Sequence, residues 1–287
     1  MLTGPRPAAV APPFPGPCPP PLDPRRPSAD FESAMRHFFT ILGHEIRMLL
    51  TSPSTYIAAV LFLAITGFLF TGILEFYSGQ PQETSPTHEF FRYFWLLVFT
   101  MVPLMSMKSV SEERRLGTLE TLLTTPVSTA EVVLGKFGAV YFFYLLLWAS
   151  TSGLFYIMHH FATDARLLDP GSLVGGYLYI AVSGLLFVAI GVFASALARN
   201  QAVAAVLAFV MLFVLIFGVG LALDVQLLQL AAFRPVHAAL DYAQVFQHLD
   251  DFSRGIIDTR HLLFYGTGTT LTLILTILGV EVRLLHH

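Results

Sequence analysis

Residues 112–123 read Glu112-Glu113-Arg114-Arg115-Leu116-Gly117-Thr118-Leu119-Glu120-Thr121-Leu122-Leu123, the densest cluster of charge in a chain that otherwise avoids charge. A long hydrophobic segment lies on each side of this cluster. The leucines in it recur at a helical spacing, so one face of a short helix would be apolar. Thr124-Thr125-Pro126 then ends the helix. The segment therefore predicts a surface helix over about 112–125, between two apolar parts of the chain.

The composition indicates an integral membrane protein. The chain has 287 residues, of which 55% are hydrophobic and only 12% are charged, and its mean hydropathy is +0.67. A soluble domain typically has about 25% charged residues. The net charge of −3 gives no reason to expect nucleic-acid binding. Cys18 is the only cysteine, so an internal disulfide and a cysteine metal cluster are both excluded.

Six uncharged windows follow one another along the chain. A helix that spans a membrane needs roughly 17–25 apolar residues, and five of the windows reach that length. The predicted fold is therefore an all-α integral membrane protein with six transmembrane helices, over about 54–75, 90–110, 132–158, 172–198, 201–223 and 261–282. A buried core helix is an alternative for 201–223.

The second window is the short one. Its uncharged part covers only 93–107, although Phe90 and Phe91 extend it. Arg92 and Lys108 can reach the membrane surface from its two ends. Pro103 lies inside this window and predicts a kink.

Residues 1–30 are predicted to be a disordered, proline-rich tail. They hold 11 of the 18 prolines and have too little apolar surface to form a core. They also lack the apolar core of about 7–15 residues that marks a secretory signal. Met35 is an alternative start of the protein, because the regular patterning begins near it.

Residues 31–50 are predicted to form an amphipathic helix at the membrane interface. Apolar residues recur there at a helical spacing. The remaining positions include Arg36, His44, Glu45 and Arg47. This pattern is too polar to span a membrane and is typical of an interfacial helix.

The distribution of Lys and Arg favours an orientation with both termini in the cytoplasm. With the amino end inside, 11 of the 16 Lys and Arg residues fall on inner segments and 5 on outer segments. The acidic residues divide 9 inside and 10 outside, so the inner segments carry +2 and the outer segments −5. Cytoplasmic segments of membrane proteins carry an excess of Lys and Arg. Residues 224–260 then form the longest extracytoplasmic loop, in which we expect short interfacial or re-entrant helices.

The predicted surface helix leads directly into the third span. Ser128-Thr129-Ala130-Glu131 is a capping box, with Ser128 as the N-cap and Glu131 at the third helical position. The chain therefore leaves one span, crosses the membrane surface and enters the next. A plain charged loop over 112–125 is the alternative, because charge is common at a membrane boundary.

This part of the sequence resembles the signature of type-2 ATP-binding cassette (ABC) transporter permeases. The matching residues are Glu113-Arg114-Arg115-Leu116-Gly117-Thr118-Leu119-Glu120-Thr121-Leu122-Leu123, Pro126-Val127-Ser128 and Glu131-Val132-Val133-Leu134-Gly135-Lys136. In addition, His44-Glu45-Ile46-Arg47 with Ser52-Pro53-Ser54-Thr55-Tyr56 resembles the amino-terminal elbow helix of that family. Asp251-Phe252-Ser253-Arg254-Gly255-Ile256-Ile257-Asp258 is similar to the subfamily of gliding-motility permeases (GldF-like). The resemblance covers about residues 35–287.

The resemblance implies a permease subunit that couples ATP hydrolysis in a separate subunit to export or to force transmission. The surface helix over 112–125 would be the coupling helix of this family, which contacts the ATPase. The residues implied in that contact are Glu112, Glu113, Arg114, Arg115, Gly117, Thr118, Leu119 and Glu120.

The chain itself is expected to be neither an ATPase nor another enzyme. It contains no G-x-x-x-x-G-K-[ST] phosphate-binding loop, so ATP would be bound by the partner and no cofactor by this chain. The resemblance further implies an ABC ATPase as partner, a homodimer or a paired permease, contact with membrane lipid, and a place in the bacterial inner membrane. Two permease and two ATPase subunits would form the assembly.

Histidine and acidic residues near the outer loop raise a different possibility. His159, His160, His237, His248 and His261 show no H-x-x-x-H or H-E-x-x-H spacing, so we expect water-exposed side chains and no metal site.

The acidic residues Asp250, Asp251 and Asp258 are likewise expected on a solvated surface. The alternative to a permease is a membrane-anchored enzyme or scaffold that uses residues 224–261, with His237 and Asp251 as its candidate reactive residues.

Small residues recur within the fourth and fifth predicted spans. The fourth has Gly184, Gly191 and Ser195, and the fifth has Ala204 and Ala208. Such spacings let two helices approach closely. Packing within one subunit and a dimer interface both remain open as the reason for them.

Overall fold

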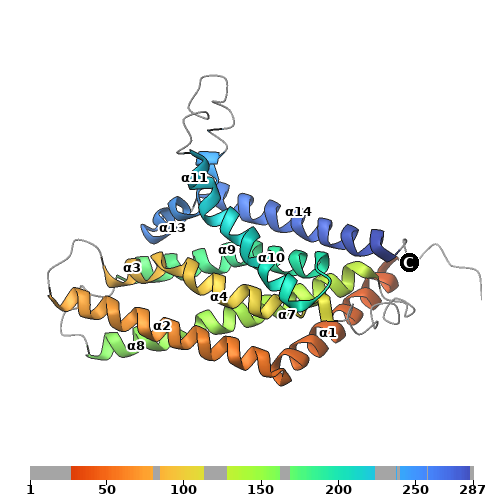
Figure 1. Cartoon of the computed structure of the whole chain (residues 1–287), viewed down its shortest axis with the longest axis horizontal. Helices are drawn as coiled ribbons and strands as arrows, with labels where there is room; N and C mark the ends of the chain where they lie inside the picture. The colour runs from red at the N-terminus through yellow and green to blue at the C-terminus, as the bar shows by residue number, and fades with distance from the viewer. Residues whose placement is uncertain are drawn as a thin grey trace, which may run out of the picture.

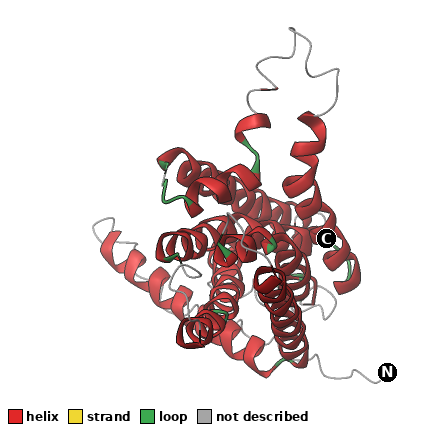
Figure 2. Ribbon diagram, turned by 90° about the vertical axis from the view of Figure 1, so that its left-hand side faces the viewer, coloured by secondary structure: helices red, strands yellow, loops and turns green. Residues whose placement is uncertain are grey.

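The computed structural model describes residues 27–79, 85–112, 128–161, 169–223, 237, 240–256 and 258–284. In this part of the chain the regular elements are all helices, and none is a strand (Figure 1, Figure 2). Five helices are long and apolar enough to cross a membrane, namely Pro53–Ser78, Thr129–Phe161, Pro170–Leu197, Gln201–Leu223 and Thr259–Val282. The predicted all-helical membrane fold is thus confirmed, although the count of six spans is not.

The helices follow the predicted windows along the chain. They are α1 (Pro27–Thr51), α2 (Pro53–Gly79), α3 (Pro86–Arg92), α4 (Phe94–Ser106), α7 (Thr129–Ser150), α8 (Ser152–Phe161), α9 (Pro170–Leu197), α10 (Gln201–Phe213), α11 (Val219–Leu223), α13 (Val245–Ser253) and α14 (Thr259–Leu284). Between α10 and α11, residues Val214–Gly218 form a π-helical turn. The first helix begins at Pro27 rather than at 31, because the fixed φ of proline suits the first turn of a helix.

The second window contains two helices instead of one continuous span. They meet at Tyr93, whose N–H bonds to the Phe90 carbonyl at 3.2 Å in a tighter turn than that of an α-helix. The second piece, α4, has 13 residues, fewer than the roughly 17 that a spanning helix needs. Pro103, where we expect a kink, lies inside α4. A continuous helix over 90–110 is therefore not what the structure contains.

The helix α9 lies at the centre of the bundle. It packs against α3, α4, α7, α10, α13 and α14. Within its most apolar stretch 72% of the residues are buried, against 50% or less in each of the other four candidate spans. Large aromatic side chains from several helices surround it, among them Phe91, Phe94, Tyr144 and Tyr265, all almost fully buried.

Glycines on α9 allow these neighbours to approach. A Cβ at Gly176 would overlap the ring of Phe91, and a Cβ at Gly184 would overlap the ring of Tyr144. A Cβ at Gly191 would meet Ser106 of α4. These contacts show that the small residues of the fourth span are used for packing within one subunit.

The alanines of α10 serve the same purpose. Ala204 and Ala208 are fully buried, and α10 packs directly on α9. Of the two reasons that we consider for the small residues, packing within the subunit is therefore the one that the structure supports.

Helix α1 packs along the start of α7. A Cβ at Gly135 would lie 2.7 Å from Ile41, and one at Gly138 would lie 3.1 Å from Leu42. Figure 1 shows that α1 leaves α2 at a sharp angle, and the change of direction falls at Ser52. The apolar stripe predicted for 31–50 is thus in contact with another helix of the same chain.

The glycine at 184 provides a test of how tightly α7 and α9 pack. The variant Gly184→Ala should lower the apparent melting temperature in detergent, because the added methyl group has no space beside the buried ring of Tyr144. Overpacking of this kind typically costs about 1–3 kcal/mol. The matched control is Gly266→Ala in α14, where nothing lies within 4 Å of the added carbon. Equal melting temperatures for the two variants would contradict this packing.

Candidate functional site

The predicted coupling residues lie at the edge of the described part of the chain. Glu112 is the last described residue before the gap at 113–127, and it is half-buried. The other seven, from Glu113 to Glu120, lie outside the described residues. The structure therefore describes the two flanks of the predicted coupling helix, which are residues 107–112 (the first flank) and 128–136 (the second flank).

The first flank is held against α9 by one hydroxyl group. The backbone N–H groups of Val110 and Ser111 each donate a hydrogen bond of 3.1 Å to Ser195 Oγ. The same hydroxyl donates to the Met107 carbonyl at 3.2 Å. Ser195 is fully buried, so water does not replace these bonds. A single side chain of α9 thus satisfies three backbone groups of the turn that follows α4.

The first flank also contacts the junction of α1 and α2. Lys108 Nζ donates a hydrogen bond of 3.2 Å to Ser52 Oγ. Ser52 lies between the two helices and also bonds through its side chain to Ser54, at 2.9 Å. The first flank therefore touches both α9 and the point where α1 turns into α2.

The second flank begins with the predicted capping box. Ser128 Oγ accepts a hydrogen bond from the Glu131 N–H at 3.3 Å, and Glu131 Oε2 accepts one from the Ser128 N–H at 3.2 Å. Both bonds of the motif are present, so this prediction is confirmed. The cap determines that α7 starts at Thr129.

A buried ion pair joins the second flank to α1. Lys136 Nζ lies 2.6 Å from Glu45 Oε1, and the two side chains are only 3% and 12% exposed. From the sequence, Glu45 belongs with the polar positions of the amphipathic helix, and its partner cannot be inferred. The available signal is its spacing, because Glu45 follows Ile41 by four residues and Leu42 by three and so shares their face.

The two flanks lie at the same end of the bundle. Figure 1 shows the start of α7 and the helix α1 together at that end, whereas α3, α8 and α13 lie at the other. Hydrogen bonds at this end join α1 to α7, the α1–α2 junction to the first flank, and the first flank to α9. These contacts connect the two flanks with α1, α7 and α9.

The model of the family described as ABC-2 family transporter protein matches residues 39–283 of this chain. The chain belongs to this family. It is a multi-pass membrane protein and a permease subunit of an ABC transporter, and membership implies an ABC ATPase as partner. The match does not extend to the gliding-motility subfamily, which stays a prediction. A search of curated proteins finds no match.

Two histidines of this ABC-2 permease are placed differently from our expectation. His248 and His261 are buried, with exposed fractions of 2% and 7%, whereas His159 and His160 at the end of α8 are exposed as predicted. The rings of His248 and His261 lie 4.1 Å apart between α13 and α14. Water exposure was the wrong prediction for this pair, because α13 packs on α9 and the two rings contact each other and the side chains of Tyr242, Phe252, Phe264 and Tyr265.

The contacts of His248 determine its tautomer. Its Nε2–H donates to the Tyr242 carbonyl at 2.8 Å, which leaves Nδ1 to accept from the Tyr265 hydroxyl at 3.1 Å. Burial lowers the pKa of His248 to about 4, so the ring is neutral at ordinary pH. Its neutral form is therefore part of the packing between α13 and α14.

The acidic residues of the outer region have specific partners. Asp251 accepts a hydrogen bond of 3.2 Å from His261 Nε2, and Asp250 faces His88 at 3.5 Å. Asp258 accepts from the Arg260 N–H at 2.9 Å, at the start of α14. The side chains of Asp250 and Asp251 are 47% and 41% exposed, which agrees with the predicted solvated surface, although each also contacts a histidine of another helix. The Asp258 bond is local to the start of α14. Within the described ranges, no three His, Cys, Asp or Glu side chains are grouped as metal ligands would be.

The ion pair between α1 and α7 yields a second test. Lys136→Met should destabilise the protein by about 3–5 kcal/mol, because it leaves the Glu45 carboxylate buried beside an apolar group. The double variant Glu45→Gln/Lys136→Met removes both charges and should recover part of the loss. Melting temperatures in detergent measure both effects. A double variant less stable than Lys136→Met would be evidence against a direct pair.

The buried histidine predicts a dependence of stability on pH. In the unfolded chain His248 takes up a proton near pH 6.5, whereas in the folded chain it does so only near pH 4. The unfolded state therefore binds more protons between these values, and stability falls as the pH is lowered through this window, by at most about 1.4 kcal/mol per unit. Comparison of wild type with His248→Gln isolates this contribution. Parallel curves for the two proteins between pH 6.5 and 4 would refute it.

Proposed function

We propose that this chain forms the membrane path of an ATP-driven complex, and that a coupling helix over 112–125 receives the movement of a separate ATPase. In this proposal the second window completes a set of six spans, and both termini lie in the cytoplasm. Residues Glu112 to Glu120 form the contact with the ATPase. The complex exports a substrate or transmits force across the bacterial inner membrane.

The bonds of Ser195 are the observation that supports the proposal most directly. They connect the first flank to α9, the helix on which most of the bundle packs. Backbone groups in an apolar environment keep their hydrogen bonds, because an unpaired buried N–H costs about 1–3 kcal/mol. A coupling helix that moves the first flank would therefore move α9 with it.

The second flank would transmit the same movement to α1. The Glu45–Lys136 pair is buried, so separating it carries a desolvation cost that favours joint movement of α1 and α7. Binding of ATP to the partner would then select one of two arrangements of these helices, as a ligand does in any two-state system. Two copies of this chain, or this chain and a second permease, would work with two ATPases.

A crosslinking experiment tests this function. Cys18 is replaced by serine, a single cysteine is introduced by Thr118→Cys, and the protein is co-expressed with whichever ABC ATPase is encoded nearest to its gene. A crosslink to the ATPase that changes when ATP is added is the expected result, because the coupling helix would move when the ATPase pair closes. The readout is the fraction of crosslinked product on a denaturing gel.

The control places the cysteine at the other end of the bundle. The control variant is His160→Cys. His160 is exposed and belongs to α8, the helix that lies at the end opposite to α1 (Figure 1), so this variant should give no crosslink. If Thr118→Cys gives no more product than His160→Cys while the two proteins co-purify, residue 118 is not in the contact and the proposed coupling helix is wrong.

A further inference from the structure

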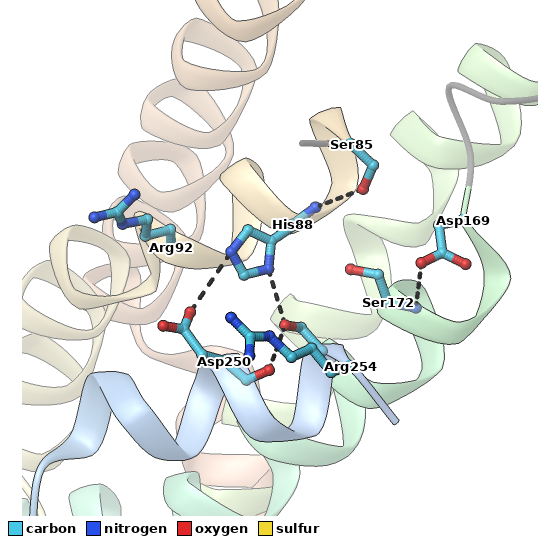
Figure 3. A pocket seen from close by; sticks show the side chains of 8 residues that line it. Ser85, His88, Arg92, Asp169, Ser172, Asp250 and Arg254 are labelled. Carbon is cyan, nitrogen blue, oxygen red and sulfur yellow. Dashed lines mark hydrogen bonds and ion pairs between the residues drawn. The ribbon is translucent and has the colours of Figure 1, made fainter. Parts of the chain in front are cut away.

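A polar cleft lies at the end of the bundle opposite to the coupling flanks. It has a volume of about 450 Å³ and is enclosed by α3, the start of α9 and α13 (Figure 3). It is lined by serines, two arginines, two aspartates and one histidine, and by no large apolar side chain. The lining of the cleft is therefore polar, although the core of the bundle beside it is apolar.

The walls of the cleft are held in place by close backbone contacts. A Cβ at Gly175 of α9 would overlap the Phe252 carbonyl of α13, so the two backbones touch there. His88 of α3 faces α13 on both sides of its ring: Nδ1 lies 2.9 Å from Ser253 Oγ, and Nε2 lies 3.5 Å from Asp250 Oδ1. The cleft is therefore formed by three helices that pack directly on one another.

A buried hydroxyl group points into the cleft without a partner. Ser172 is 2% exposed, and its Oγ makes no hydrogen bond in the structure. Figure 3 shows the side chain directed from the first turn of α9 toward His88 and Arg254. A buried hydroxyl normally has a hydrogen-bond partner, so this one is available to a group bound in the cleft.

The groups that remain available in the cleft are donors of hydrogen bonds. Among the described residues no carboxylate pairs with the guanidinium of Arg254, and that of Arg92 reaches only Glu89, at 4.0 Å. Guanidinium groups bind the oxygens of phosphates and carboxylates through paired hydrogen bonds.

The two carboxylates of the cleft, in contrast, are already engaged. Asp169 accepts from the N–H groups of Gly171 and Ser172, at 3.1 and 3.4 Å, and Asp250 faces His88. The positive end of the α9 dipole further offsets the charge of Asp169. An incoming anion therefore meets the guanidinium groups of Arg254 and Arg92 as donors, while the two carboxylates have contacts of their own.

We propose that this cleft binds a phosphate group, held by Arg254, Arg92 and the Ser172 hydroxyl. The phosphate belongs either to a lipid headgroup or to a soluble ligand, because the cleft lies where α3 and α9 begin. In the orientation proposed above, this is the extracytoplasmic surface of the membrane. The site does not depend on the ATPase or on the coupling helix.

Calorimetric titration of the purified full chain in dodecyl maltoside, without any ATPase, tests the site. One titrant is inorganic phosphate and the other is dihexanoyl phosphatidylglycerol below its micelle concentration. We expect saturable binding of at least one of them, weakened about tenfold or more by Arg254→Gln and by Ser172→Ala. Binding of phosphate alone identifies a soluble ligand, and binding of the lipid alone identifies a headgroup.

The matched control is Arg260→Gln, which removes an exposed arginine at the start of α14, outside the cleft. It should bind like wild type. The proposal is overturned if neither titrant binds at millimolar concentration or if Arg254→Gln binds like wild type. It is also overturned if Arg254→Gln and the control Arg260→Gln weaken binding equally. Gel filtration and far-ultraviolet circular dichroism check that each variant is folded, and Ser172→Ala removes only one oxygen atom. Since no ATPase is present, failure here is separate from failure of the proposed transport function.

Discussion

Close approach to α9 is the constraint on which the rest of the bundle depends. The helix exposes backbone instead of side chain at Gly175, Gly176, Gly184 and Gly191, and a different neighbour occupies each position. In a membrane there is little hydrophobic force between helices, so their association relies on tight packing and on hydrogen bonds between them. The glycines supply the first, and Ser195, one turn beyond Gly191, supplies the second. Both kinds of contact therefore come from one helix, whose glycines face different neighbours on several sides.

The features that could be predicted from the sequence are local ones. The capping box was predictable because its two residues are three positions apart, and the helices followed from windows without charge. The pair of Glu45 and Lys136 was not predictable, since its members are 91 positions apart and their meeting depends on how α1 folds back on α7. The burial of His248 and His261 was not predicted for the same reason. Their polar side chains led us to expect exposure to water, but their burial depends on the packing of α13 on α9. The break at Tyr93 was not predicted, because the aromatic residues Phe90 and Phe91 extend the second window and Arg92 can reach the membrane surface.

The two polar regions of this ABC-2 permease lie at opposite ends of the bundle. At the end with α1, the hydroxyl of Ser195 and the ion pair of Lys136 meet their partners within the chain, whereas the buried Ser109 hydroxyl has none among the described residues. At the other end, Ser172 and Arg254 remain without partners among the described residues. Buried polar groups stabilise a fold only when they are satisfied. In the proposed site, a bound phosphate would supply partners for Ser172 and Arg254.

The length of α9 has a mechanical consequence. Its 28 residues make a rod about 42 Å long, with Ser195 near one end and the cap Asp169 at the other. A rod of this length acts as a lever: a tilt of about 5° around one end would carry the other end through roughly 4 Å. That distance exceeds the length of a hydrogen bond, so a small rotation at the first flank would displace the start of α9, which lines the cleft. One continuous helix thus connects the two polar ends of the bundle.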